Sequence, residues 1–150
     1  MPYQKIIEKL PYGASFLFVD ELVDIDMEGA SGKFTFRKEL DFFKSHFKDN
    51  PVTPGVILTE CCAQIGLVAF GIFLLLEAGK YDLEEFGIGF SSSEMEFYKP
   101  VFPDETVTVT SKKIYFRFNK LKCDVKMHNA KRELVCKGTL SGMLNLKSDA

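Results

Sequence analysis

The longest apolar stretch of the chain runs from Cys61 to Leu76, and Gln64 is its only strongly polar side chain. The stretch is short of the roughly 20 residues needed to cross a bilayer, and Glu60 and Glu77 bound it. A helix that is apolar on every side is normally surrounded by protein. The pattern therefore predicts a buried central helix and no membrane span.

Signals for the ends of a helix frame this stretch. Thr53 can act as the N-cap, and Pro54 suits the first helical position. Gly79 suits the residue that follows the last helical turn. The sequence therefore predicts a helix over residues 54–78.

Alternation of polar and apolar positions dominates the rest of the chain, as is typical of half-buried strands. Strands are predicted after the helix over residues 94–100, 105–118, 120–128 and 133–146, with a hairpin turn at 129–132. Before the helix, residues 16–25 and 32–37 suggest a further hairpin, and residues 3–10 a short amphipathic helix. The result is an α+β domain with about six antiparallel strands curved around one helix. A second copy of the chain would cover the helix face that the sheet leaves open, which favours a homodimer.

Length and composition fit a single domain over residues 1–150, because 15 phenylalanines can fill one core but not two. The net charge of −2 and the scattered lysines give no basic footprint for nucleic acid. The start of the chain lacks the apolar stretch of a secretion signal, and the four cysteines form no C-x-x-C pair. These features indicate a cytoplasmic protein with reduced, mostly buried cysteines.

Two titratable side chains stand in apolar surroundings. His46 is one of two histidines and is framed by phenylalanines, while Glu60 is the only charged residue between Asp49 and Glu77. A lone carboxylate is costly to bury without a task. A base and an acid in apolar surroundings are what proton transfer at neutral pH requires. His46 and Glu60 are therefore the candidate catalytic residues.

The segment that contains these two residues resembles a known active-site motif. Its elements, in order, are His46, Pro51, Pro54, Gly55, Glu60 and Gln64. Their spacing is similar to that in the bacterial 3-hydroxyacyl-acyl-carrier-protein dehydratases, the hot-dog-fold enzymes of type II fatty acid synthesis. Weaker similarity extends to residues 6–20 and 97–103.

This resemblance implies a hot-dog fold and the dehydration of a 3-hydroxyacyl thioester on acyl carrier protein to the trans-2-enoyl thioester. His46 would remove the proton at C2, and Glu60 would protonate the departing C3 hydroxyl group. In that family the two side chains come from different subunits of a dimer. The reaction requires no metal and no organic cofactor.

Four further residues are candidates for binding the substrate. The amides of Gly55 and Val56 are free donors at the helix start that could stabilise negative charge on the thioester oxygen. Gln64 lies one turn beyond Glu60, where its amide could hold the carboxyl group. Gly66, among the small residues of the helix, is expected to leave room for the acyl chain.

The chain also departs from the family pattern. Ser45 stands where glycine is usual, and residues 11–15 replace a Pro-His-x-x-Pro stretch with a tyrosine at the histidine position. Residues 91–93 and 103–105 differ as well, which suggests a divergent member. Two alternatives stay open: a thioesterase on the same fold, which would not need His46 as a C2 base, and a non-catalytic acyl-binding partner subunit, which loss of His46 or Glu60 would have favoured.

Overall fold

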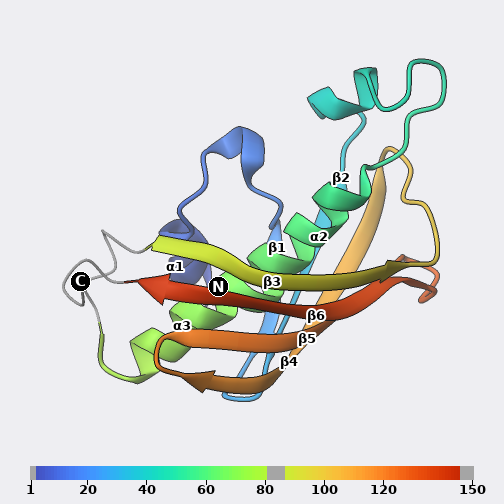
Figure 1. The fold of residues 1–150 in the computed structure, drawn as a ribbon. Coiled ribbons are helices and arrows are strands. Elements are labelled where there is room, and N and C mark those ends of the chain that lie inside the picture. The colour runs from blue at the N-terminus through green and yellow to red at the C-terminus, as the bar shows by residue number, and fades with distance from the viewer. Residues whose placement is uncertain (1–2, 81–86, 146–150) are drawn as a thin grey trace.

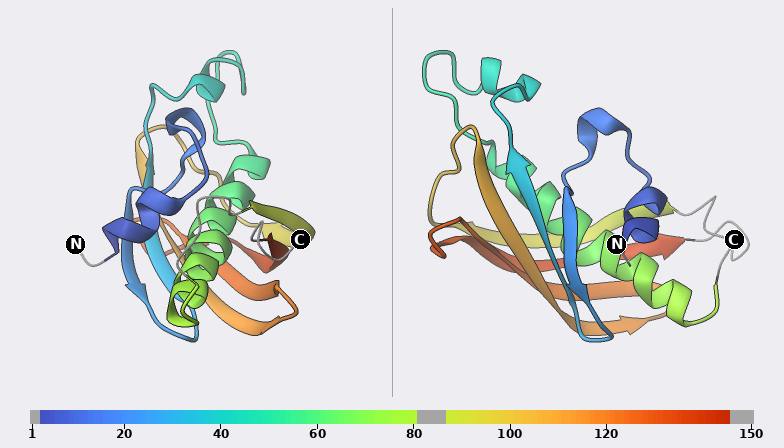
Figure 2. Two further views of the ribbon diagram at one scale, coloured as in Figure 1. Left: turned by 90° about the vertical axis from the view of Figure 1, so that its left-hand side faces the viewer. Right: turned by 180° about the vertical axis from the view of Figure 1, so that it is seen from behind.

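One long helix lies along the concave face of a curved antiparallel sheet in the computed structural model, which describes residues 3–80 and 87–145 (Figure 1). Two further views show the sheet wrapped around this helix (Figure 2). The arrangement is the hot-dog fold, and it confirms the predicted α+β class.

The sheet has six strands in the order β1-β2-β4-β5-β6-β3, with every neighbouring pair antiparallel. The strands are β1 (Glu21–Ile25), β2 (Ala30–Phe36), β3 (Gly87–Phe97), β4 (Glu105–Arg117), β5 (Lys120–His128) and β6 (Leu134–Asn145). Among the strands that the structure describes, this order places β1 and β3 at the two edges of the sheet, each with one neighbouring strand.

The helical elements are α1 (Gln4–Lys9), the short 3-10 helices η1 (Ala14–Phe16) and η2 (Asp41–Lys44), and the central helix. The central helix runs without a break through α2 (Gly55–Ala63), the π-helical segment η3 (Gln64–Ala69) and α3 (Phe70–Glu77). It ends as predicted, at Gly79 with a positive φ of 83°. The amide of Gly79 donates to the carbonyl of Leu76, and that of Lys80 to the carbonyl of Leu75, the pattern of a Schellman motif.

The helix start differs from the prediction. Pro54 rather than Thr53 is the N-cap, and no side chain makes a capping hydrogen bond there. The Thr53 side chain turns into the protein instead: it is 4% exposed, and its hydroxyl has no hydrogen-bond partner among residues 3–80 and 87–145. The first amides of α2 therefore keep their hydrogen-bonding capacity.

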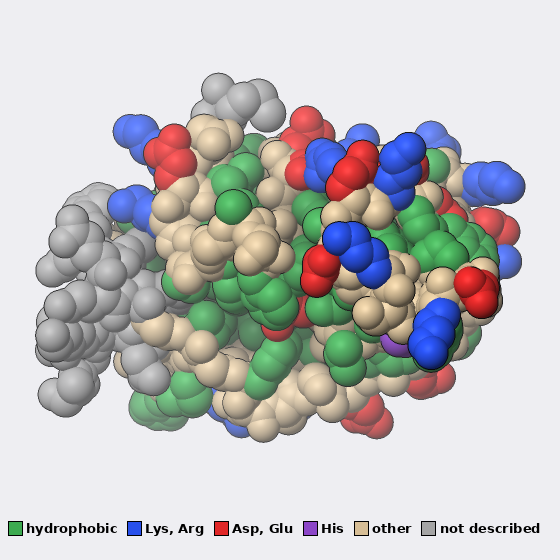
Figure 3. Space-filling view, turned by 90° about the horizontal axis from the view of Figure 1, so that it is seen from above, with side chains coloured by type: hydrophobic (Ala, Val, Ile, Leu, Met, Phe, Trp, Pro, Cys, Tyr) green, Lys and Arg blue, Asp and Glu red, His purple; other side chains and the backbone are tan. Residues whose placement is uncertain are grey.

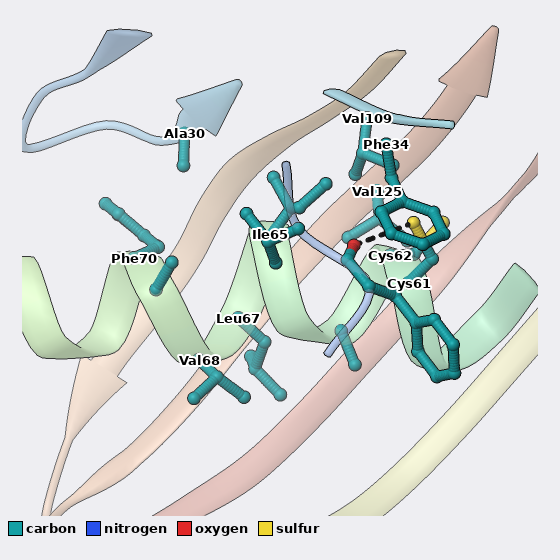
Figure 4. Close-up of a cluster of buried hydrophobic side chains, with 14 of the residues drawn as sticks. Ala30, Phe34, Cys61, Cys62, Ile65, Leu67, Val68, Phe70, Val109 and Val125 are labelled. Carbon is teal, nitrogen blue, oxygen red and sulfur yellow. Dashed lines mark hydrogen bonds between the residues drawn. The ribbon is translucent and has the colours of Figure 1, made fainter. Parts of the chain in front are cut away.

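The central helix is the middle of the hydrophobic core. By length and composition Gly55–Glu77 could cross a membrane, but 72% of its most apolar window is buried inside the protein, as in the core helix of a folded domain. Figure 4 shows helix residues Ile65 and Phe70 in the buried cluster that also contains Val109 and Val125 of the sheet. All four cysteines are free and buried, as predicted.

The chain before β1 also differs from the prediction. Residues 16–25 are predicted as one strand, but Phe16 belongs to η1 and β1 begins only at Glu21. The reason is a hydrogen bond over a long sequence distance: the amide of Phe18 donates to the side-chain oxygen of Gln64 at 2.7 Å, so it pairs with the helix rather than with a strand. This contact fixes the loop before β1 against the central helix.

Candidate active site

Glu60 lies half-buried in α2, and Gln64 holds it in place. The side-chain nitrogen of Gln64 donates to Glu60 Oε2 at 2.9 Å and to the carbonyl of Phe16 at 2.9 Å. Its side-chain oxygen accepts the Phe18 amide. Gln64 is fully buried, so this one side chain fixes both the carboxyl group and the loop that passes it.

Burial sets the protonation of Glu60. Loss of contact with water raises the pKa of the Glu60 carboxyl, and the hydrogen bond from Gln64 lowers it by a smaller amount. A carboxyl group with a raised pKa keeps its proton at higher pH than an exposed glutamate does. Glu60 is therefore suited to act as a general acid.

The start of α2 presents hydrogen-bond donors close to Glu60 in the sequence. Gly55 and Val56 are the first residues of the helix, so no helical carbonyl precedes them by one turn to accept their amide protons. No other acceptor within the described residues bonds to these two amides. Val56 is 76% exposed. Gly55 faces the ring of Phe97, which would lie 3.4 Å from a Cβ atom at that position. These two amides can thus stabilise an anionic oxygen at the positive end of the helix.

Two hollows adjoin at Glu60. The first is a groove between Gly55, Val56 and Ile57 of α2 and Met95 and Phe97 of β3. The second is a pocket of about 150 Å³ whose wall includes Tyr12, Ala63, Leu67, Val68 and Ile88. Phe16, Glu60 and Phe90 line both hollows. The carboxyl-bearing residue therefore stands where the groove meets the pocket.

Gly66 is not part of either wall, contrary to the prediction that it leaves room for an acyl chain. A Cβ atom on Gly66 would lie 2.9 Å from Ser111 Cβ and 3.0 Å from Val125 Cγ1, both on the sheet. The missing side chain lets the helix approach β4 and β5 closely. Ala63 is the small residue of the helix that lines the pocket.

Replacing Gly66 with leucine is therefore expected to destabilise the fold. The added side chain must displace Ser111 and Val125, and overpacking of this kind typically costs about 1–3 kcal/mol of unfolding free energy. Urea denaturation measures the change. Gly13→Leu is the matched control, because nothing lies within 4 Å of its Cβ position, and it should have little effect. Equal stability of the two variants would contradict the packing role of Gly66.

His46 follows η2 in the segment between β2 and α2, which extends beyond the end of the sheet (Figures 1 and 2). Its ring stacks on that of Phe47, with centroids 4.0 Å apart, and its Nδ1 is 2.9 Å from the carbonyl oxygen of Val52. The Val52 contact leaves Nε2 as the nitrogen that could accept a proton. His46 lines neither hollow at Glu60. Within one described chain, the two candidate catalytic residues are therefore not brought together.

Tyr12 is a site residue that the sequence reasoning missed. It lines the pocket beside Glu60 and comes from the loop between α1 and η1. The only sequence signal was its place in residues 11–15, where the family motif has a histidine. A departure from a motif at a single position does not show where the new side chain lies.

Comparison with protein families identifies a FabA-like domain over residues 10–140. The 3-hydroxyacyl-[acyl-carrier-protein] dehydratase FabZ of Ehrlichia ruminantium strain Gardel is 35% identical over 118 residues, which is 76% of this chain and 77% of that protein. FabZ of Caldicellulosiruptor bescii is 31% identical over 140 residues, 91% of this chain and 93% of the relative.

Solved structures agree on the fold. The dehydratase heterocomplex ApeI:P from Xenorhabdus doucetiae has a TM-score of 0.79 at 10% identity and covers 95% of this chain and 92% of the solved one. A hypothetical thioesterase from Streptococcus pneumoniae with coenzyme A has a TM-score of 0.59 at 14% identity and covers 83% of this chain and 84% of the solved one. At these identities the structures show the shared fold alone. The family match and the sequence relatives place the chain in the FabA-like family, as a divergent member of its FabZ dehydratase branch.

Proposed function

We propose that this protein dehydrates a 3-hydroxyacyl thioester carried by acyl carrier protein, giving the trans-2-enoyl thioester and water, in the cytoplasm. The observation that carries the proposal is the Glu60 site. A carboxyl group with a raised pKa, held by a buried glutamine, stands at the junction of two apolar hollows. The family match and the FabZ relatives point to dehydration as the reaction in which this carboxyl group would act as the acid.

Each step of the reaction has a residue to perform it. His46 takes the proton from C2, and the electrons of that C–H bond become the C2–C3 double bond. The C3–O bond breaks, and Glu60 gives its proton to the departing oxygen, which leaves as water. Negative charge on the thioester oxygen is stabilised by the amides of Gly55 and Val56. Proton-transfer steps of this kind typically contribute about 10²–10⁴-fold each, and they require no metal or organic cofactor.

The two hollows suit the two ends of such a substrate. The groove begins at the Gly55 and Val56 amides, where the thioester would lie, and reaches Glu60. The pocket continues from Glu60 between apolar walls that include Leu67 and Ile88, which suits an acyl chain. With the carbonyl at the helix start, C3 would lie near Glu60. Ala63 rather than Gly66 would then border the acyl chain.

A second copy of the chain would complete the site. β3 is an edge strand, and such edges readily pair with another chain. β3 itself exposes the side chains of Phe90 (51%) and Phe97 (48%), and Val56 of α2, which lines the same groove, is 76% exposed. Figure 3 shows hydrophobic side chains exposed between charged ones on the face seen from above. We therefore propose a homodimer in which His46 of one subunit reaches the Glu60 site of its partner, since His46 lines neither hollow of its own chain.

Gln64 gives this proposal a pH test. Because its hydrogen bond lowers the pKa of Glu60, Gln64→Leu should raise that pKa further. Glu60 acts as an acid only while protonated, so turnover falls as the pH rises through this pKa. The fall should move to higher pH in Gln64→Leu, as measured in a pH–rate profile.

The same variant should unfold more easily, because it leaves the Phe18 amide and the Phe16 carbonyl without their partner. The Phe18 amide is buried, and leaving a buried donor unpaired costs about 1–3 kcal/mol. Gln4→Leu, at an exposed position of α1, is the matched control and should change neither the profile nor the stability. An unchanged pH–rate profile in a folded Gln64→Leu variant would contradict the role of Gln64 at Glu60.

The proposed reaction is tested by incubating the protein with a 3-hydroxyacyl thioester of acyl carrier protein. Mass spectrometry of the acyl group should show loss of one water, with the absorbance of a conjugated enoyl thioester. Release of a free thiol would instead identify a thioesterase, and an unchanged substrate a non-catalytic acyl-binding subunit. Either result would overturn the proposal.

A further inference from the structure

We propose that Tyr12 is a further catalytic residue, whose phenol donates a hydrogen bond to the oxygen that leaves C3 of the substrate. The role rests on the proposed dehydration. Tyr12 would be a second hydrogen-bond donor to the leaving oxygen, in addition to Glu60. It lies in the loop between α1 and η1, outside the sequence motif that contains His46 and Glu60.

The composition of the pocket is the first argument. Of the described residues that line the wall, Tyr12 and Glu60 alone have polar side chains, and the others are alanine, valine, leucine, isoleucine and phenylalanine. A polar atom of a substrate in this pocket therefore has two side chains with which to form hydrogen bonds. In a 3-hydroxyacyl chain whose C3 lies at Glu60, the nearest such atom is the hydroxyl oxygen.

Tyr12 lies close in sequence to the loop residues that Gln64 ties to the helix beside Glu60. Gln64 bonds to the Glu60 carboxyl and also to the backbone of Phe16 and Phe18, and so attaches the loop before β1 to the helix. The Tyr12 ring packs near that of Phe16, with centroids 6.2 Å apart. Tyr12 is thus supported against the helix at Glu60, and this support favours a defined position for a catalytic group.

The phenol is available as a donor. Among residues 3–80 and 87–145 no group is hydrogen-bonded to the Tyr12 hydroxyl. Burial, and secondarily the negative charge of Glu60, raise the pKa of Tyr12 far above its ordinary value. Tyr12 therefore keeps its proton across the range in which the enzyme would work, and its hydroxyl can donate to a substrate atom.

The chemistry gives this donor a task at one moment of the reaction. As the C3–O bond breaks, its electron pair stays on oxygen, which becomes more negative until it receives the proton of Glu60. A hydrogen bond from Tyr12 stabilises that growing charge more than the neutral hydroxyl of the ground state. Tyr12 keeps its own proton throughout, water departs, and Glu60 remains as the carboxylate to be reprotonated from solvent.

The test is Tyr12→Phe, which removes only the hydroxyl group. We expect kcat to fall by about 10-fold or more, because a donor to developing charge is lost, while KM changes by less than about twofold. Affinity for the saturated acyl thioester, which has no C3 hydroxyl, should stay at the wild-type value. Tyr3→Phe is the matched control: its hydroxyl bonds to Asp24 away from the pocket, and its kinetics should be those of wild type.

A double variant separates catalysis from packing. If Tyr12 and Glu60 act on the same leaving oxygen, adding Tyr12→Phe to Glu60→Gln should lower kcat much less than it does in the wild-type background. An unchanged kcat in Tyr12→Phe would overturn the role of Tyr12. So would a loss of affinity for the saturated thioester as large as the loss in kcat. Either result would leave the proposed function standing. A wild-type protein that dehydrates nothing would overturn both.

Discussion

Glu60→Gln and His46→Ala should each lower the rate of dehydration by about 100-fold or more, because each removes one proton-transfer step. Glutamine has the size of glutamate but no acidic proton, so it can still accept the hydrogen bond from Gln64 at 2.9 Å. His46 is only half-buried, outside the main core, so its truncation should leave the fold intact. Steady-state turnover of a 3-hydroxyacyl thioester measures both effects.

The chain offers a matched control for each variant. Glu77→Gln makes the same change at the exposed far end of the same helix, and His128→Ala removes the other histidine, at the end of β5. Both should keep wild-type turnover. If folded Glu60→Gln or His46→Ala also kept near-normal turnover, the acid or the base would have to be another residue.

Mixing the two inactive variants should restore activity. In a mixed dimer of His46→Ala and Glu60→Gln subunits, one site receives the intact His46 of one subunit and the intact Glu60 of the other. Random exchange of subunits would leave about a quarter of all sites complete, and activity should rise toward that fraction of the wild-type value. The measurement is turnover after the subunits have been mixed and allowed to exchange.

The reverse experiment is the control for this recovery. A subunit with both substitutions, mixed with wild type, forms dimers in which neither site has both groups, so activity should fall below that of the wild-type subunits alone. If each subunit held a complete site, the double variant would not inhibit its partner. That outcome, or a stable and active monomer, would contradict a site shared between subunits.

The elements that the sequence predicts well are those with one clear repeating pattern. β4, β5 and the described part of β6 lie within one residue of the predicted strands, and in β5 the buried side chains alternate with more exposed ones as a half-buried strand requires. The central helix also begins and ends within one residue of its predicted bounds. An apolar run of that length must be buried, and the proline before it and the glycine after it mark its ends. β3 begins at Gly87 rather than at residue 94, because its first half is a mostly exposed edge with little alternation.

Long-range contacts account for what the sequence could not predict. The loop from Tyr12 to Phe18 is positioned by Gln64, a residue 46 positions from Phe18, and no local pattern contains that pairing. The sequence also could not show whether Gly66 faces the sheet or the pocket. A helix that is apolar on all sides has no polar–apolar periodicity to tell its two faces apart. Neither the sequence spacing nor the structure of one chain brings His46 and Glu60 together. In the proposed dimer, His46 of one subunit meets Glu60 of the other.

A substrate labelled with heavy oxygen in its C3 hydroxyl group tests the central claim most directly. Dehydration places the label in the released water, and the enoyl thioester that remains on the carrier protein contains none. We predict this distribution for the wild-type protein, with turnover that depends on both His46 and Glu60. Label retained in a free 3-hydroxy acid, with release of the carrier thiol, would show hydrolysis instead and contradict the account.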